Sequence, residues 1–207
     1  LQPQLFKDGA PNGLQIEGND QIRHINTTVT ASQAAINHAI AQGADTLLVH
    51  HGLFWRNEPT AIIGWKKQRI AALLAHNINL IGYHLPLDAH PTLGNNAQLA
   101  AKLHWQPENT FGEQNLLNIG TLPESQRTLA QLAQAVEQTL GRTPTIIGNP
   151  KQPLTRIAWC TGGAQWYFQA AIDANADVYL TGEISEAQYH LANETDTAFI
   201  AAGHHAT

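Results

Sequence analysis

The sequence is most constrained by a short apolar run that ends in two adjacent histidines. Residues Thr46–Val49 are apolar or β-branched and predict a strand buried on both faces. His50, His51 and Gly52 follow directly. Neutral imidazole is the commonest metal ligand in proteins, and successive strand residues point to opposite faces, so this pair suits two adjacent ions better than one. A hydrogen-bonded pair of structural histidines at a strand end is the alternative.

Strand and helix patterns alternate on both sides of this run, which predicts an α/β fold. Residues 1–20 contain several turn formers and predict a loop. The expected strands are 25–30, 46–49, 78–83, 156–160, 178–180 and 198–202, with weaker candidates at 115–122 and 143–147. The expected helices are 31–42, 65–76, 95–103, 128–140, 164–174 and 185–193.

An internal repeat relates the two ends of the chain. Adding 132 to the numbers of residues 25–51 gives seven identities without a gap, among them Asp45 with Asp177. The pattern predicts two similar βαβ lobes related by duplication, and chance similarity of two βαβ units is the alternative. The predicted division is a first lobe at 1–104, an inserted segment at 105–153 and a second lobe at 154–207. Asp45 and Asp177 precede strands and are interpreted as loop or cap residues.

Polar side chains follow several of these strands where each strand ends. Ligands of open α/β sheets bind at the carboxyl ends of the strands, so we expect these groups to converge on one site between the lobes. A His, Asp and Glu set without a thiolate favours Zn, Mn, Fe, Co or Ni, and such residues can form a two-metal centre. The set comprises His50, His51, His84, Asp88, Glu183 and His204. Taken singly, His84 could be a structural histidine, Asp88 a turn residue and His204 a surface group.

Proton transfer at such a centre needs a further acid or base. Glu183 is the predicted catalytic residue, and Glu186, one helical turn on, is the alternative. His90 lies near Asp88 in sequence and is expected either to orient that ligand or to face the substrate. Cys160 is interpreted as a small buried residue rather than a nucleophile. The basic group at 66–69 is interpreted as a solvated helix face.

Charge and composition exclude several classes of protein. The net charge is −5 without a Lys/Arg cluster, which argues against a nucleic-acid surface as the main function. No apolar run approaches the roughly 20 residues of a membrane span. The single cysteine cannot form an intrachain disulfide, and no signal peptide is evident, so we expect a cytosolic protein.

Several motifs together resemble the NIF-three-like family, whose bacterial members are called GTP cyclohydrolase type 2 homologues. They are the segment 12–18 (NGLQIEG), the segment 50–55 (HHGLFW), the segment 84–88 (HLPLD), Gly182-Glu183 and the final segment 203–207 (GHHAT). The resemblance implies a two-lobed α/β protein that forms a toroidal homohexamer and binds two divalent metal ions per chain. The implied ligands are His50, His51, Asp88 and His204, with His84 orienting Asp88.

The resemblance also places an acidic ligand four residues after the final histidine, at position 208. The repeat independently leads to the same position, because Asp88 follows His84 by four residues and His204 is the counterpart of His84. We therefore expect the sequence to be part of a longer chain with an acidic residue at 208.

The function implied by the resemblance is hydrolysis of a nucleotide, with a metal-bound hydroxide attacking the purine ring of GTP or a similar substrate. Nothing in the residue patterns alone selects a purine. Two other functions remain open: a metal-binding or metal-delivery protein without turnover, and a regulatory oligomeric scaffold.

Overall fold

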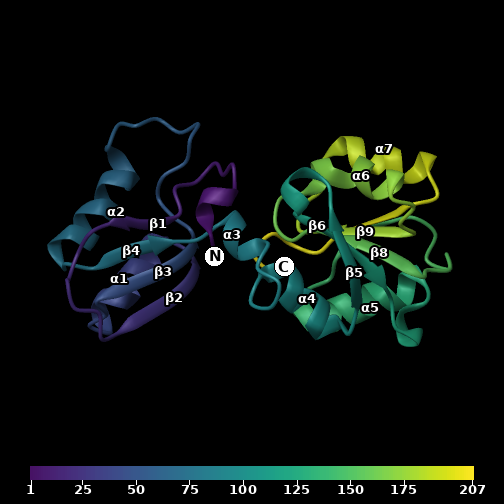
Figure 1. The fold of residues 1–207 in the computed structure, drawn as a ribbon, viewed down its shortest axis with the longest axis horizontal. Coiled ribbons are helices and arrows are strands. Elements are labelled where there is room, and N and C mark those ends of the chain that lie inside the picture. The colour runs from purple at the N-terminus through teal and green to yellow at the C-terminus, as the bar shows by residue number, and fades with distance from the viewer. The chain divides into compact units, whose positions relative to one another are not determined.

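The computed structural model describes residues 1–207, which form two compact units, Leu1–Leu87 and Asp88–Thr207 (Figure 1). Each unit has its own β-sheet, so the predicted mixed α/β class is confirmed. The predicted division at 1–104, 105–153 and 154–207 concerns duplicated lobes and an insert rather than packing units, and it stays a prediction. None of the helices has both the length and the hydrophobicity needed to traverse a bilayer.

Unit 1 contains a four-stranded sheet in the order β1-β4-β3-β2. The last three strands are mutually parallel, and β1 pairs antiparallel with β4. The strands are β1 (Gly13–Ile16), β2 (Ile25–Thr30), β3 (Thr46–His51) and β4 (Asn79–Gly82); the helices are α1 (Gln33–Ala41), α2 (Gly64–Ala75) and the short 3-10 helix η1 (Pro3–Leu5). The core between sheet and helices includes Ile36, Leu47, Leu73 and Leu80.

Local sequence signals explain most of these elements. Ser32 caps α1 by accepting a hydrogen bond from the Ala35 N–H at 3.1 Å, and Gly43 follows the helix with φ +63°. The strand predicted at 25–30 is confirmed, whereas β3 extends through His51, so both histidines are strand residues. The prediction of a loop throughout 1–20 is wrong at β1, a four-residue edge strand between turn-forming residues.

Unit 2 contains a six-stranded mixed sheet in the order β5-β6-β8-β9-β10-β7. Its strands are β5 (Gln106–Phe111), β6 (Leu117–Thr121), β7 (Thr145–Ile147), β8 (Arg156–Trp159), β9 (Val178–Thr181) and β10 (Ala198–Ala201). Its helices are α4 (Asn95–Leu103), α5 (Leu129–Leu140), α6 (Phe168–Asp173) and α7 (Glu186–Glu194), with 3-10 turns η2 (Glu113–Asn115), η3 (Glu124–Gln126) and η4 (Gln165–Tyr167); α3 (Leu85–Asp88) runs across the boundary of the units.

Helices cover both faces of this sheet, with α4 and α5 on one side and α6 and α7 on the other (Figure 1). Alternate residues of the central strands therefore enter two cores. Trp159 and Leu180 pack with residues of α4 and α5, whereas Tyr179 and Phe199 form aromatic contacts with Phe168 of α6. The edge strand β5 was not predicted, because its polar and Pro-containing sequence lacks an apolar alternation.

The strand–helix–strand segments compared in the sequence fold alike. β2-α1-β3 and β8-α6-β9 occupy corresponding positions, and the turn before the second strand has the same hydrogen bonds in both units. The Asp45 carboxylate accepts from two backbone N–H groups at 2.9 and 3.0 Å, and the Asp177 carboxylate does so at 2.7 and 2.8 Å. Both aspartates are loop residues, as predicted, and the duplication itself stays a proposal.

Candidate metal centre

Three histidines of unit 1 converge at the carboxyl ends of β3 and β4. His50, His51 and His84 each offer one ring nitrogen, and these three atoms lie within 4.8 Å of one another. The ring centroids are 4.6 Å apart for His50 and His51, and 5.0 Å apart for His50 and His84. Trp55 packs edge-on against His84 at 5.1 Å. Three half-buried imidazoles at this spacing form a donor set that could hold a metal ion.

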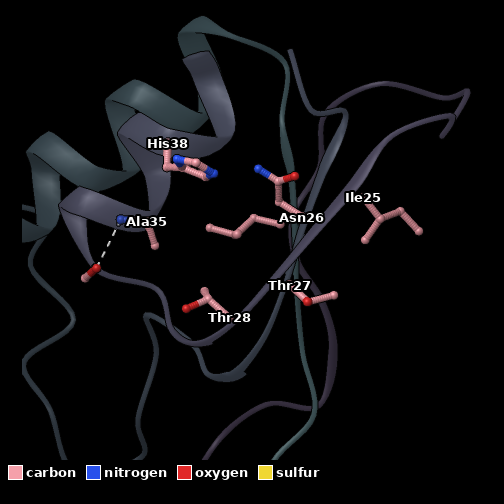
Figure 2. A pocket seen from close by; sticks show the side chains of 8 residues that line it. Ile25, Asn26, Thr27, Thr28, Ala35 and His38 are labelled. Carbon is pink, nitrogen blue, oxygen red and sulfur yellow. Dashed lines mark hydrogen bonds between the residues drawn. The ribbon is translucent and has the colours of Figure 1, made fainter. Parts of the chain in front are cut away.

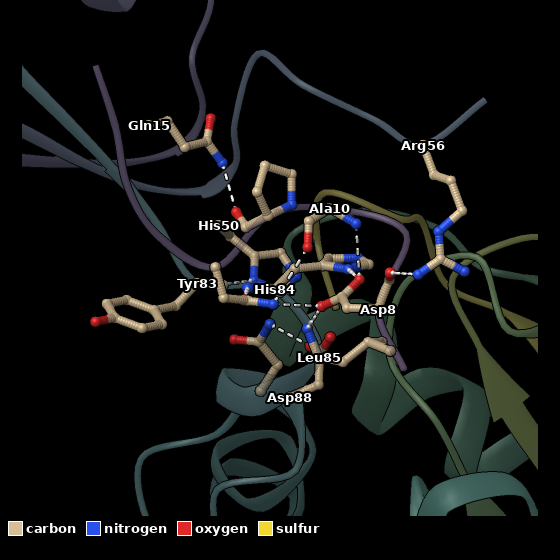
Figure 3. Close-up of polar contacts among 12 residues, drawn as sticks. Asp8, Ala10, Gln15, His50, Arg56, Tyr83, His84, Leu85 and Asp88 are labelled. Carbon is tan, nitrogen blue, oxygen red and sulfur yellow. Dashed lines mark hydrogen bonds and ion pairs between the residues drawn. The ribbon is translucent and has the colours of Figure 1, made fainter. Parts of the chain in front are cut away.

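The hydrogen bonds of these rings define which nitrogen carries a proton. His50 Nδ1 lies 2.8 Å from the Tyr83 carbonyl oxygen, and His84 Nδ1 lies 2.7 Å from a carboxylate oxygen of Asp8 (Figure 3). Both partners only accept, so Nδ1 carries the proton, and in the neutral ring the lone pair lies on Nε2. His51 Nδ1 lies 3.2 Å from the Thr30 hydroxyl, which can donate or accept.

Asp8 connects the amino-terminal segment to His84. It is 8% exposed and accepts hydrogen bonds from the His84 ring, the Asn12 side chain and the backbone N–H groups of Ala10 and Leu85. Burial alone raises the pKa of the Asp8 carboxyl, but the hydrogen bonds outweigh burial and lower that pKa well below its usual range. Asp8 is therefore a carboxylate at neutral pH and holds His84 in one tautomer.

Side chains of the segment 12–18 contact the loops that carry the same histidines, so this sequence motif has a structural role. The Asn12 side-chain oxygen accepts the His84 backbone N–H at 2.8 Å. The Gln15 amide lies over Gly52 and Gly82, where any Cβ would overlap it at 2.1 and 2.7 Å. Gln15 also accepts from the Leu53 N–H at 3.0 Å. These interactions fix the loops after β3 and β4.

The roles of Asp8, Asn12 and Gln15 in the site were not predicted from the sequence. The signal available was the motif at 12–18, whose polar side chains precede the strands that they support. Asp8 itself stands outside that motif in a turn-rich segment. Nothing in the residue pattern indicates its pairing with a histidine 76 positions later.

In unit 2, Glu183 and His204 form a direct pair. His204 Nδ1 lies 2.6 Å from a Glu183 carboxylate oxygen, so Nδ1 donates and Nε2 keeps its lone pair. Gly162 and Gly163 lie against this pair, because a Cβ at either position would come within 3.2–3.5 Å of the His204 ring or the Glu183 carboxylate. The side chains of Glu183 and His204 are 45% and 41% exposed. Glu183 thus orients the imidazole that the resemblance assigns as a ligand.

Asp88 and His90 lie in the segment at the start of unit 2. Asp88 ends α3, and one of its carboxylate oxygens accepts from the Asn95 side chain at 2.8 Å. His90 Nδ1 accepts from the backbone N–H groups of Thr92 and Leu93 at 3.3 and 3.1 Å. The neutral His90 ring therefore carries its proton on Nε2, a tautomer that suits contact with a substrate or an acceptor better than metal ligation. Its assignment stays a prediction.

Other sequence-based interpretations have clear structural outcomes. Cys160 is buried, as predicted, and burial followed by the nearby Asp88 charge raises the pKa of its thiol to about 12, which disfavours a thiolate nucleophile. The prediction of a solvated basic face at 66–69 is wrong for Lys66. That side chain is buried, lies over the Phe54 ring and pairs with Glu58 at 3.4 Å.

Two hollows of unit 1 lie outside the histidine cluster. One, of about 530 Å³, lies between the edge strand β2 and α1 and is lined by Asn26, Thr28 and His38 among others (Figure 2). The other, of about 360 Å³, is lined by residues 8–11 and 54–56. The first contains none of the predicted site residues, and the second adjoins Asp8.

The fold and the cluster define a two-sheet α/β protein with a histidine-rich site that could bind metal. The chain belongs to the Duf34/NIF3 (NGG1p interacting factor 3) family, whose model matches residues 1–207. A protein of Neisseria meningitidis serogroup B named GTP cyclohydrolase 1 type 2 homolog is 65% identical over 207 residues, which are 100% of this chain and 83% of that relative. The family resemblance seen in the sequence is thus confirmed.

Solved structures agree with this assignment. The structure described as protein ybgI, of unknown function, superposes with a TM-score of 0.94 at 46% identity and covers 98% of this chain and 81% of that one. A protein from Thermus thermophilus superposes with a TM-score of 0.83 at 31% identity, covering 99% of this chain and 81% of that one. The fold is therefore shared by relatives of widely different sequence.

Proposed function

We propose that this protein binds divalent metal through the cluster of His50, His51 and His84. The observation that carries the proposal is the placement of the rings: the three ring nitrogens lie within 4.8 Å of one another, and Nδ1 of His50 and of His84 each face an oxygen that only accepts. Carbonyl and carboxylate partners on the second nitrogen are typical of metal-binding histidines. Imidazole nitrogen suits Zn, Fe and Ni among the ions expected from the sequence, whereas Mn would need carboxylate ligands from the wider set.

The wider ligand set remains a prediction. It contains His50, His51, Asp88 and His204 and holds two ions, and the pairing of His204 with Glu183 supports its membership. The His84–Asp8 pair gives His84 a stronger claim to ligation than the role of orienting Asp88 that the sequence suggested. The homohexamer and the cytosolic location also stay predictions.

We further propose that the metal-loaded protein is a hydrolase acting on a nucleotide ring, as the name of its Neisseria relative suggests. A bound divalent ion lowers the pKa of water and so supplies a nucleophile near neutral pH. Glu183 lies within hydrogen-bond distance of His204, which supports the proposal that it holds or returns a proton there. Asp8 keeps His84 oriented throughout, because its carboxylate is ionised over the working pH range.

The test is incubation of GTP with protein loaded with Zn²⁺, Mn²⁺ or Fe²⁺, followed by mass spectrometry. Hydrolytic ring opening adds one water and breaks one ring C–N bond, so the product is heavier by one water. The Glu183→Gln variant should bind metal and lose most turnover, about 100-fold for a lost acid–base group. Metal binding without any product from GTP would refute the hydrolase proposal and leave a metal-binding or metal-delivery protein.

A further inference from the structure

Unit 2 contains a polar hollow of about 240 Å³ beside Asp88, which no sequence pattern predicted. Its wall is built from the segment after α3, the first turn of α4, the edge strand β5 and one residue of β6. The lining includes four asparagines: Asn96, Asn109, Asn115 and Asn118. Asparagine side chains at a concave surface offer hydrogen-bond donors and acceptors that can orient a ligand.

The sheet register places part of this lining on one face of the sheet. Asn118 is paired with Trp159 on one side and Thr110 on the other, so the three side chains share one face. Trp159 is fully buried under α4 and donates its indole N–H to the Asn96 carbonyl. On the same face, Asn118 and Thr110 line the hollow together with Asn96 and Ala97 from the first turn of α4.

The side-chain amides of the four asparagines differ in their hydrogen bonding. Asn96 is 2% exposed and fixed, because it donates to the Leu116 carbonyl and accepts the Thr161 N–H. The side chains of Asn109, Asn115 and Asn118 make no hydrogen bond within the chain. These three present both donors and acceptors to the hollow.

The loop that carries Asn115 is held in an unfavourable backbone conformation. Gln114 and Asn115 have φ of 53° and 57°, two successive non-glycine residues in the left-handed region. This conformation costs about 1 kcal/mol or more per residue, least for Asn. Strained backbone conformations cluster at functional sites. Here the strained backbone of Gln114 and Asn115 holds the Asn115 side chain in the lining of the hollow.

The charge of the lining restricts the ligand. Asp88 and Glu108 are carboxylates, and neither lysine nor arginine lines the hollow. Arg156 approaches Glu108 only to 3.9 Å and lies outside the lining. A phosphate group therefore meets no cationic side chain in the lining, whereas amino and ring N–H groups meet carboxylate and amide acceptors. The volume is below the range of about 300–1,000 Å³ for drug-sized ligands and suits a single heterocyclic base.

We propose that this amide-lined hollow binds an uncharged heterocycle with ring amide groups, such as the guanine base of a nucleoside, and excludes phosphate. The choice of guanine rests on the proposed function, because guanine is the base of the nucleotide proposed there as the substrate. The amides read the ring carbonyl and N–H groups, and the carboxylate of Glu108 accepts an exocyclic amino group.

The experiment separates the two halves of GTP and omits metal. Guanosine and inorganic triphosphate are titrated by calorimetry into the EDTA-treated protein, and then into Asn118→Leu and Asn109→Leu. Asn193→Leu is the matched control, because Asn193 is exposed on α7 outside the hollow. We expect guanosine but not triphosphate to bind, and each hollow variant to weaken guanosine binding about tenfold for one lost hydrogen bond, with the control unchanged.

Circular dichroism melts show whether each variant is folded; the exposed Asn109 provides the test should Asn118→Leu unfold. Absence of guanosine binding, equal binding of triphosphate, or full affinity in both hollow variants would overturn the proposal. Because metal is absent, these results are independent of the histidine cluster. Failure of the cluster to bind metal would leave the guanosine result standing.

Discussion

Each unit of this protein holds a carboxylate–histidine pair, and the two pairs differ in burial. In unit 1, the side chains of Asp8 and His84 are 4% and 21% exposed, and Asp8 accepts four hydrogen bonds. In unit 2, the side chains of Glu183 and His204 are 45% and 41% exposed. The same chemical pair is therefore buried among hydrogen-bond donors in one unit and partly exposed to solvent in the other.

The residues at the ends of the corresponding strands also differ between the two units. His50 of unit 1 corresponds to Gly182 of unit 2 in the repeat. A side chain at 182 would meet the Gly162 carbonyl oxygen and the His204 Cα at 2.6 Å, so that position cannot carry an imidazole. Unit 1 therefore concentrates imidazoles at its strand ends, whereas unit 2 uses close backbone packing to place one histidine and one glutamate.

The largest expected effect on stability concerns the buried pair. Asp8→Ala leaves the backbone N–H groups of Ala10 and Leu85 and the ring Nδ1–H of His84 without their acceptor. We therefore expect a loss of about 3 kcal/mol in the free energy of unfolding. Glu183→Ala removes an exposed partner and should cost less than about 1 kcal/mol. Urea denaturation of both variants measures the difference. Equal losses would show that burial does not distinguish the two pairs.

A smaller loss of stability is expected for a substitution at Gly182, the counterpart of His50 in the repeat. Gly182→Ala forces a Cβ against two backbone segments, and overpacking of this kind costs about 2 kcal/mol. Gly9→Ala is the control, because a Cβ at Gly9 meets nothing within 4 Å. Thermal melts should show a lowered midpoint only for Gly182→Ala. An unchanged midpoint would contradict the close packing of the strand ends in unit 2.

The smallest losses of stability are expected at Asp45 and Asp177, which accept matching hydrogen bonds in the two units. Asp45→Asn and Asp177→Asn each weaken two hydrogen bonds from backbone N–H groups and should cause small, similar losses. Hydrogen bonds from the Arg23 and then the His24 backbone N–H lower the pKa of Asp45 below its usual value. The stabilisation by Asp45 is therefore fully present above the pKa of an unfolded aspartate, and it is lost as the pH falls through the lowered pKa of the folded protein.

Stability curves against pH should therefore show wild type and Asp45→Asn converging in acid. Curves that stay parallel down to the lowest pH would show that the Asp45 charge does not contribute.

The sequence predicts the regular parts of this fold well, because hydrophobic periodicity and capping residues are local. Strand 25–30 and helix 95–103 have the predicted bounds, and the repeat locates matching aspartates. The strands β1 and β5 were missed, since both are edge strands without a clear apolar alternation.

The site was predictable only in part for a related reason. Strand-end histidines can be recognised from their own neighbourhood, so His50, His51 and His84 were all identified. Their partners depend on tertiary contacts: Asp8 meets His84 across 76 residues, and the Tyr83 carbonyl fixes His50 across 33. The amide-lined hollow likewise depends on tertiary contacts, because its lining comes from α4, β5, β6 and the segment after α3, which are separate in the sequence.

Metal binding by the histidine cluster can be measured directly by plasma mass spectrometry of the purified protein. The comparison uses wild type, His50→Ala/His51→Ala, and His38→Ala/His190→Ala, whose histidines are exposed on α1 and α7. We predict about one to two divalent ions per chain in wild type and control, and loss of metal from a folded cluster variant. Equal metal in all three proteins, or none after incubation with Zn²⁺, Mn²⁺ and Fe²⁺, would contradict the claim and leave the histidines as structural groups.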